Sequence, residues 1–148
     1  MGRILGLDYG RRRIGVAISD PLGVTAQPLT TWSGLCRNDV VDKVLTLIEE
    51  MEVERVVVGL PLSLSGKRGP MAREVERFTE HLKQRIGIPV TLWDERLTST
   101  QARRVIHKIQ EKPSRNKEKV DLIASVLLLQ NYLDHQKGAM LNRREEKD

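Results

Sequence analysis

Three short apolar segments crowd into the first 32 residues, and their close spacing constrains the fold more than any other feature of the sequence. They span residues 3–8, 14–19 and 24–32. The connections between them are too short for a crossover helix, so neighbouring segments can pair only as hairpins. We therefore expect the chain to begin with an antiparallel meander of three strands.

After residue 37, short apolar runs alternate with stretches of helical periodicity. The β-branched run Val56, Val57 and Val58 is the strongest strand signal, and Pro70 suits the first turn of a helix. Strands are expected over residues 55–60 and 90–93. Helices are expected from Asn38 or Asp39 to Met51, from Pro70 to Gly87, from Thr98 or Ser99 to Gln110, and from Val120 to Tyr132.

The order of these elements predicts the fold class. Because each later strand follows a helix, it should lie parallel to the first strand. The result is an α/β fold with a five-stranded mixed sheet, in which an antiparallel meander is joined by parallel strands and helices cover both faces. A chain of 148 residues suffices for one core and not for two. We expect a single domain over residues 1–137 and a polar, frayed tail over residues 138–148.

The charge balance favours a polyanionic partner. The chain has 25 Lys and Arg against 20 Asp and Glu, a net charge of +5, and a pI near 9.6. Aromatic residues make up only 3% of the chain, too few for a platform that stacks nucleic-acid bases. No apolar run approaches the roughly 18 residues of a membrane span, and Asp8 with the arginines after it interrupts any N-terminal signal. We expect a cytoplasmic protein with no membrane partner.

Carboxylates close two of the expected parallel strands and open the final helix. Asp8 ends the first strand, Asp94 and Glu95 follow the last one, and Asp121 lies where the final helix begins. The carboxyl ends of parallel strands meet at one edge of a sheet, where ligands gather. Side chains alternate along a strand, so only one of Asp94 and Glu95 can join this cluster. The spacing alone does not decide which.

Clustered carboxylates favour a divalent cation. Three carboxylates at one edge repel one another, which raises their pKa values unless a cation neutralises them. Hard oxygen ligands with no His or Cys nearby suit Mg²⁺ or Mn²⁺ better than zinc. Each acid also has an ordinary reading: Asp8 as a turn former, Glu95 in a surface ion pair, and Asp121 as a complement to the helix dipole. Only their convergence at one edge favours a metal site that acts on phosphodiesters.

A basic segment supports the same edge. Between Arg96 and Lys119, eight Lys and Arg stand against two acids, a net charge of +6. Such a segment could follow a nucleic-acid backbone, although a run of charge is more often a solvated surface. The candidate nucleic-acid-binding residues are Arg11, Arg96, Arg103, Arg104, Lys117 and Lys119.

Four sequence blocks resemble the YqgF family: ILGLDYGRRRIGVAISD (4–20), VVVGLPLSLSG (56–66), DERLTSTQA (94–102) and KVDLIASVLLLQNYLD (119–134). That family consists of bacterial RNase H-like proteins described as Holliday-junction-resolvase-like and as candidate pre-16S ribosomal RNA nucleases. The resemblance implies an RNase H-like fold and a metal site formed by Asp8, Glu95 and Asp121, with Asp94 as the substitute for Glu95. Ser99 and Ser125 depart from the family pattern without touching these acids.

The resemblance leaves the substrate open. It favours a nuclease that uses Mg²⁺ or Mn²⁺ and processes the 5′ end of precursor 16S ribosomal RNA, as a monomer or a weak dimer. The alternative is a Holliday-junction resolvase, which would need a dimer to place two sites on symmetry-related strands. A catalytically silent nucleic-acid-binding module is the non-enzyme alternative, although a binder gains nothing from clustered negative charge that faces phosphate.

Overall fold

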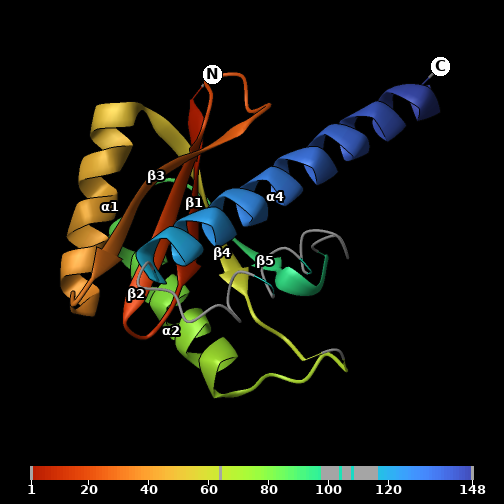
Figure 1. The fold of residues 1–148 in the computed structure, drawn as a ribbon. Coiled ribbons are helices and arrows are strands. Elements are labelled where there is room, and N and C mark those ends of the chain that lie inside the picture. The colour runs from red at the N-terminus through yellow and green to blue at the C-terminus, as the bar shows by residue number, and fades with distance from the viewer. Residues whose placement is uncertain (1, 64, 98–103, 105–107, 109–116, 148) are drawn as a thin grey trace.

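A computed structural model describes residues 2–63, 65–97, 104, 108 and 117–147, with side chains described as far as residue 139. Its centre is a five-stranded sheet in the order β3-β2-β1-β4-β5, crossed on one side by a long helix (Figure 1). The predicted fold class is confirmed, because the sheet combines antiparallel and parallel pairs and carries helices on both faces.

The N-terminal meander forms as the sequence predicts. β1 (Arg3–Tyr9) pairs antiparallel with β2 (Arg13–Ser19), which pairs antiparallel with β3 (Ala26–Ser33). β3 begins two residues later than expected. The reason is a local turn: the Asp20 carboxylate accepts backbone N–H groups from Leu22, Val24 and Thr25, which keeps these residues out of the sheet.

The two later strands lie parallel to β1. β4 (Val53–Leu60) pairs with β1 on one side and with β5 (Val90–Asp94) on the other. β4 contributes Val56, Val57 and Val58 to the interior, and all three are fully enclosed. The carboxyl ends of β1, β4 and β5 therefore meet at one edge of the sheet, as predicted.

Helices cover the two faces unequally. α1 (Arg37–Met51) and α2 (Pro70–Arg85) pack on one face, where Val44, Phe78 and Leu82 join the larger core cluster. α4 (Lys117–Lys147) lies across the other face, where Leu129 and Tyr132 pack over the sheet. None of the described helices has a stretch both long and apolar enough to cross a bilayer.

Several predicted helix limits are wrong. α1 begins at Arg37 after Cys36, whose side chain makes no capping hydrogen bond, so neither Asn38 nor Asp39 is the cap. α4 begins at Lys117 rather than Val120, and it continues past Tyr132 to Lys147. Beyond Leu133 the sequence is polar but rich in good helix formers, so intrinsic propensity extends the helix past the sheet (Figure 1). The helix expected over residues 98–110 lies almost entirely outside the described residues.

Candidate active site

Asp8 occupies the centre of the carboxyl edge. It is the second-last residue of β1, the middle strand of the sheet. Leu7 points into the larger core cluster, on the side of α1 and α2. Because strand side chains alternate, Asp8 points to the opposite face, beneath α4.

Glycines flank Asp8 on both neighbouring strands. Gly15 of β2 pairs directly with Asp8, and the register of β1 with β4 brings Gly59 beside it, one step after the Leu7–Val58 pair. A Cβ at Gly15 would overlap the backbone carbonyl of Asp121, and a Cβ at Gly59 would lie 2.6 Å from Glu95 Oε1. The two bare positions therefore let Asp121 approach from one side of Asp8 and Glu95 from the other.

Burial and mutual repulsion perturb two of these acids. Burial, followed by the charge of Asp121, raises the pKa of Asp8 to about 6. Burial, followed by the charges of Asp8 and Asp94, raises the pKa of Glu95 to about 7. Both shifts show carboxylates whose negative charge is poorly compensated by their surroundings. The three acids are therefore linked electrostatically, because Asp121 acts on Asp8 and Asp8 acts on Glu95.

Arg13 compensates the third acid. Its Nε lies 2.6 Å from Asp121 Oδ2, and both side chains are about a quarter exposed. Arg13 begins β2 and Asp121 lies in the second turn of α4, so the ion pair ties the helix to the sheet at the site. Asp121 is the fifth residue of α4 rather than the second, because the helix starts at Lys117 and not at Val120.

Asp94 turns away from the cluster and binds Arg96. Its carboxylate accepts the Arg96 backbone N–H at 2.9 Å and the guanidinium Nη2 at 2.7 Å. These hydrogen bonds raise the pKa of Arg96. They also close a short 3-10 turn, η1 (Glu95–Leu97), immediately after β5. The turn, rather than strand alternation, sends the Glu95 carboxylate toward Gly59 while Asp94 faces Arg96.

The donor set fits a hard divalent cation. Asp8, Glu95 and Asp121 offer only carboxylate oxygens, and two of them carry raised pKa values that a cation would lower. Among the described residues, no three acidic, His or Cys side chains stand close enough to enclose an ion as they are. Of the three acids, Asp121 is paired with Arg13 in this arrangement.

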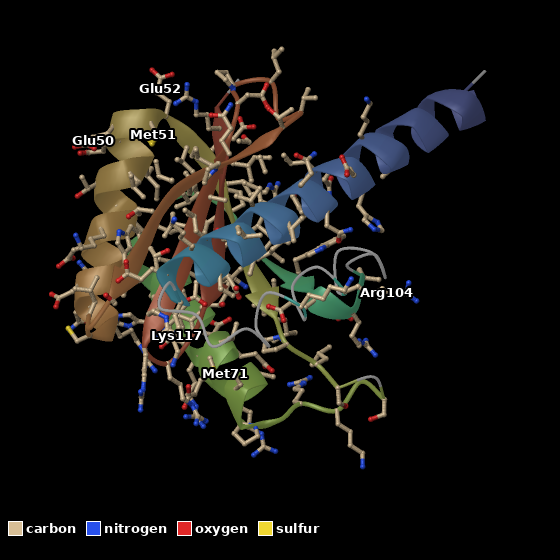
Figure 2. All side chains as sticks on the ribbon, in the orientation of Figure 1. Glu50, Met51, Glu52, Met71, Arg104 and Lys117 are labelled. Atoms are coloured by element: carbon tan, nitrogen blue, oxygen red, sulfur yellow. The ribbon has the colours of Figure 1, made fainter. Side chains whose placement is uncertain are left out.

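The predicted basic residues differ in their surroundings. Arg11 Nε lies 3.3 Å from Glu74 Oε2, so the turn before β2 is linked to α2. Arg104, Lys117 and Lys119 are exposed, and Figure 2 labels Arg104 and Lys117. The two lysines lie in the first turn of α4, not in a loop before it. Arg103 lies outside the described residues.

Sequence reasoning missed three residues that shape the site. In the sequence Arg13 is only one of three consecutive arginines, and nothing there predicts that Gly15 and Gly59 lie beside Asp8. The only signal for the glycines is that each interrupts a β-branched or apolar strand. The Arg13–Asp121 pair joins residues 108 positions apart, so nothing in the local sequence indicates it.

A family model and individual relatives all point to the same protein family. The family model RuvX, described as Holliday junction resolvase, matches residues 2–135. A protein from Thermoanaerobacter pseudethanolicus, named as a proposed pre-16S rRNA nuclease, is 48% identical over 137 residues, covering 92% of this chain and 99% of its own. A protein of the same name from a Roseiflexus species is 42% identical over 136 residues, covering 92% and 96%.

Several solved structures with a similar fold are Holliday junction resolvases. Thermus thermophilus RuvC superposes with a TM-score of 0.56 at 14% identity, covering 90% of this chain and 96% of its own. The Fowlpox virus resolvase in complex with Holliday junction DNA gives a TM-score of 0.53 at 16% identity, covering 90% and 98%. At these identities the likeness concerns the fold, and it confirms the expected RNase H-like architecture.

Proposed function

The chain belongs to the RuvX family, and from this membership we propose that it is a metal-dependent nuclease that processes the 5′ end of precursor 16S ribosomal RNA. Its reaction class is the hydrolysis of phosphodiester bonds. The observation that supports the metal dependence is the pair of partly buried acids, Asp8 and Glu95, whose raised pKa values reflect uncompensated charge at the carboxyl edge. We place this activity in the cytoplasm.

Asp8, Glu95 and Asp121 would hold the cation, either Mg²⁺ or Mn²⁺. When bound, such an ion lowers the pKa of an attacking water and stabilises the charge that develops on the phosphate. Asp8 supplies the central carboxylate from the rigid middle strand. Arg13 orients Asp121 through its ion pair, and Gly59 leaves room for the Glu95 carboxylate. Asp94 acts through Arg96 and η1, and substitutes for Glu95 only if that turn rearranges.

Basic residues around the site would hold the nucleic-acid backbone. Arg104, Lys117 and Lys119 are exposed and cationic, as phosphate contacts require. Arg103 is proposed for the same role from its sequence position. Arg11 and Arg96 already have carboxylate partners, so they would contact phosphate only in addition to Glu74 and Asp94.

Precursor RNA is favoured over four-way DNA by the names of the relatives, which are 42–48% identical to this chain. The resolvase alternative rests on the description of the family and would need a dimer that positions two sites. Because processing one RNA end needs a single site, the proposal is a monomer or a weak dimer. Three acids facing phosphate argue against a silent binding module.

One assay tests the reaction and its substrate together. Purified protein is incubated with labelled precursor 16S RNA and with a synthetic four-way junction, each in Mn²⁺, Mg²⁺ or EDTA. We expect cleavage of the RNA in either metal and none in EDTA. Asp8→Asn should reduce turnover by orders of magnitude. Asp39→Asn, which removes an exposed carboxylate from α1, is the matched control and should leave turnover unchanged.

The outcomes separate the alternatives. If only the four-way junction is cleaved, the function is junction resolution and not RNA processing. Equal cleavage by Asp8→Asn and the parent protein would remove Asp8 from the metal site. Binding of both substrates with no cleavage in any metal would support the silent module.

A further inference from the structure

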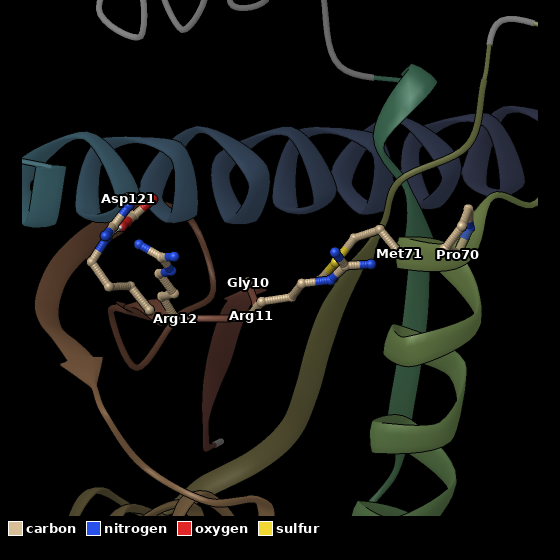
Figure 3. Close-up of a pocket in the computed structure, with 7 residues that line it drawn as sticks. Gly10, Arg11, Arg12, Pro70, Met71 and Asp121 are labelled. Carbon is tan, nitrogen blue, oxygen red and sulfur yellow. Dashed lines mark hydrogen bonds and ion pairs between the residues drawn. The ribbon is translucent and has the colours of Figure 1, made fainter. Parts of the chain in front are cut away.

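A groove next to the acids is lined by three consecutive arginines. It has a volume of about 520 Å³ and lies between the β1–β2 turn, which carries Arg11 and Arg12, and the start of α2 at Met71. Figure 3 shows Asp121 of α4 on the far side of this turn from α2. Because Asp121 also lines the groove, the groove borders directly on the acid cluster.

Only one of the three arginines keeps an unbalanced charge. Arg11 is paired with Glu74, and Arg13 is paired with Asp121. In the part of the chain that the structure describes, no side chain hydrogen-bonds to or pairs with the Arg12 guanidinium, and Arg12 is exposed. The three arginines together with the carboxylates of Glu74 and Asp121 carry a net charge of +1. A bound group with one negative charge would balance it.

Backbone hydrogen bonds hold the main chain of the turn at Arg12. The Arg12 carbonyl accepts the Gly34 N–H at 3.3 Å, and the Gly10 N–H donates to the Arg13 carbonyl at 3.0 Å. These bonds hold a long cationic side chain on a closed turn beside the groove (Figure 3). Pro70 and Met71 form the opposite wall without adding charge, which suits the sugar of a nucleotide.

We propose that this groove binds a phosphodiester of the substrate strand beside the bond that is cut, and that Arg12 makes the ionic contact. A phosphodiester carries the single negative charge that the groove lacks, and its neighbours along the strand lie within reach of the acid cluster. The inference rests on the proposed nuclease function, because it takes the acids as the point of cleavage. Arg12 is a binding residue in this scheme and does not touch the cation.

The test is equilibrium binding in EDTA, where cleavage is not expected. The full chain is titrated onto a labelled precursor RNA fragment at several salt concentrations. Arg12→Gln should weaken binding about three- to tenfold and reduce the slope of log K against log salt by about 0.7 to 0.9. Arg12→Lys, which keeps the charge, should retain the slope. Lys43→Gln, which removes an exposed charge from α1, is the matched control and should change neither quantity.

Each outcome decides the proposal. An unchanged affinity and slope for Arg12→Gln, with normal binding by the parent protein, would overturn the groove and leave the nuclease function standing. Failure of the parent to bind any RNA or four-way DNA would overturn both. An unlabelled RNA strand and a mononucleotide are also compared as competitors. If the two compete equally well per phosphate, the groove is a site for free phosphate and the proposal is overturned. Thermal melting confirms that each variant is folded.

Discussion

Gly59 limits where the carboxylate of Glu95 can lie. Glu95 Oε1 occupies the space that a Cβ at residue 59 would need, 2.6 Å away, and Leu128 closes the same space from above at 3.0 Å. The carboxylate is the free end of a side chain and can move, whereas the packed strand cannot. Any side chain at residue 59 therefore displaces Glu95 before it displaces β4.

Gly59→Ala should impair metal binding more than stability. We expect Mn²⁺ affinity and turnover to fall at least tenfold, about 1.4 kcal/mol, because Glu95 is pushed away from Asp8. Calorimetric titration with Mn²⁺ and cleavage assays provide the measurement. Gly6→Ala is the control: a Cβ there would lie 2.9 Å from Leu129 Cβ, so it strains the core under α4 without touching an acid. If both variants lose stability and neither loses metal affinity, Gly59 serves packing alone.

At the scale of elements, the join between β5 and η1 assigns different roles to two adjacent acids. Asp94 is held by Arg96, and the Arg96 guanidinium also lies against Gly66 of the loop between β4 and α2, 3.3 Å from the position of a Cβ there. Gly66 has a φ of +84°, which a residue with a side chain rarely adopts. The turn thus holds Glu95 at the cluster while Asp94 and Arg96 tie the turn to this loop.

Substitution of the two acids should separate these roles. Glu95→Gln should abolish Mn²⁺-dependent cleavage and leave the fold no less stable, since it removes a partly buried charge that Asp8 and Asp94 repel. Asp94→Asn should mainly reduce stability, by about 1 kcal/mol, because the ion pair it weakens is partly exposed. Urea denaturation and Mn²⁺ calorimetry on both variants give the comparison. Loss of the metal in Asp94→Asn with retention in Glu95→Gln would reverse the assignment.

At the scale of the whole molecule, the acid cluster makes stability depend on pH. The pKa of Asp8 is raised from 3.8 to about 6 and that of Glu95 from 4.5 to about 7. The folded protein therefore binds protons more tightly than the unfolded chain. The stability that protonation contributes is present below pH 4 and is lost as the pH rises through 6 and 7. The loss is on the order of 3 kcal/mol for each carboxyl taken alone.

In EDTA, the free energy of unfolding should fall between pH 5 and pH 7.5 more steeply in the parent protein than in Asp8→Asn. The variant lacks one titrating carboxyl and relieves the repulsion that raises the pKa of Glu95. Urea denaturation at both pH values measures the difference. Mg²⁺ or Mn²⁺ should restore stability at pH 7.5 in the parent, because ligand binding favours the folded state. Parallel pH profiles for parent and variant would contradict the raised pKa of Asp8.

The order and direction of the strands follow from local features of the sequence. Short connections enforce hairpins, intervening helices enforce parallel crossovers, and alternating apolar residues fix the buried face, so each feature is local. The same rules predict that Asp8, Asp121 and one of the pair Asp94 and Glu95 meet at one sheet edge, and they do not choose within that pair. They failed at helix ends, where α4 continues past its packed stripe on propensity alone.

The acids are held by contacts between residues that are far apart in the chain and close together in the fold. Arg13 meets Asp121 across 108 residues, Gly15 and Gly59 become essential because a helix and a carboxylate pass over them, and η1 selects Glu95 over Asp94. Each depends on the distance between elements remote in the chain. Local periodicity carries no information on that distance, because packing of whole elements sets it.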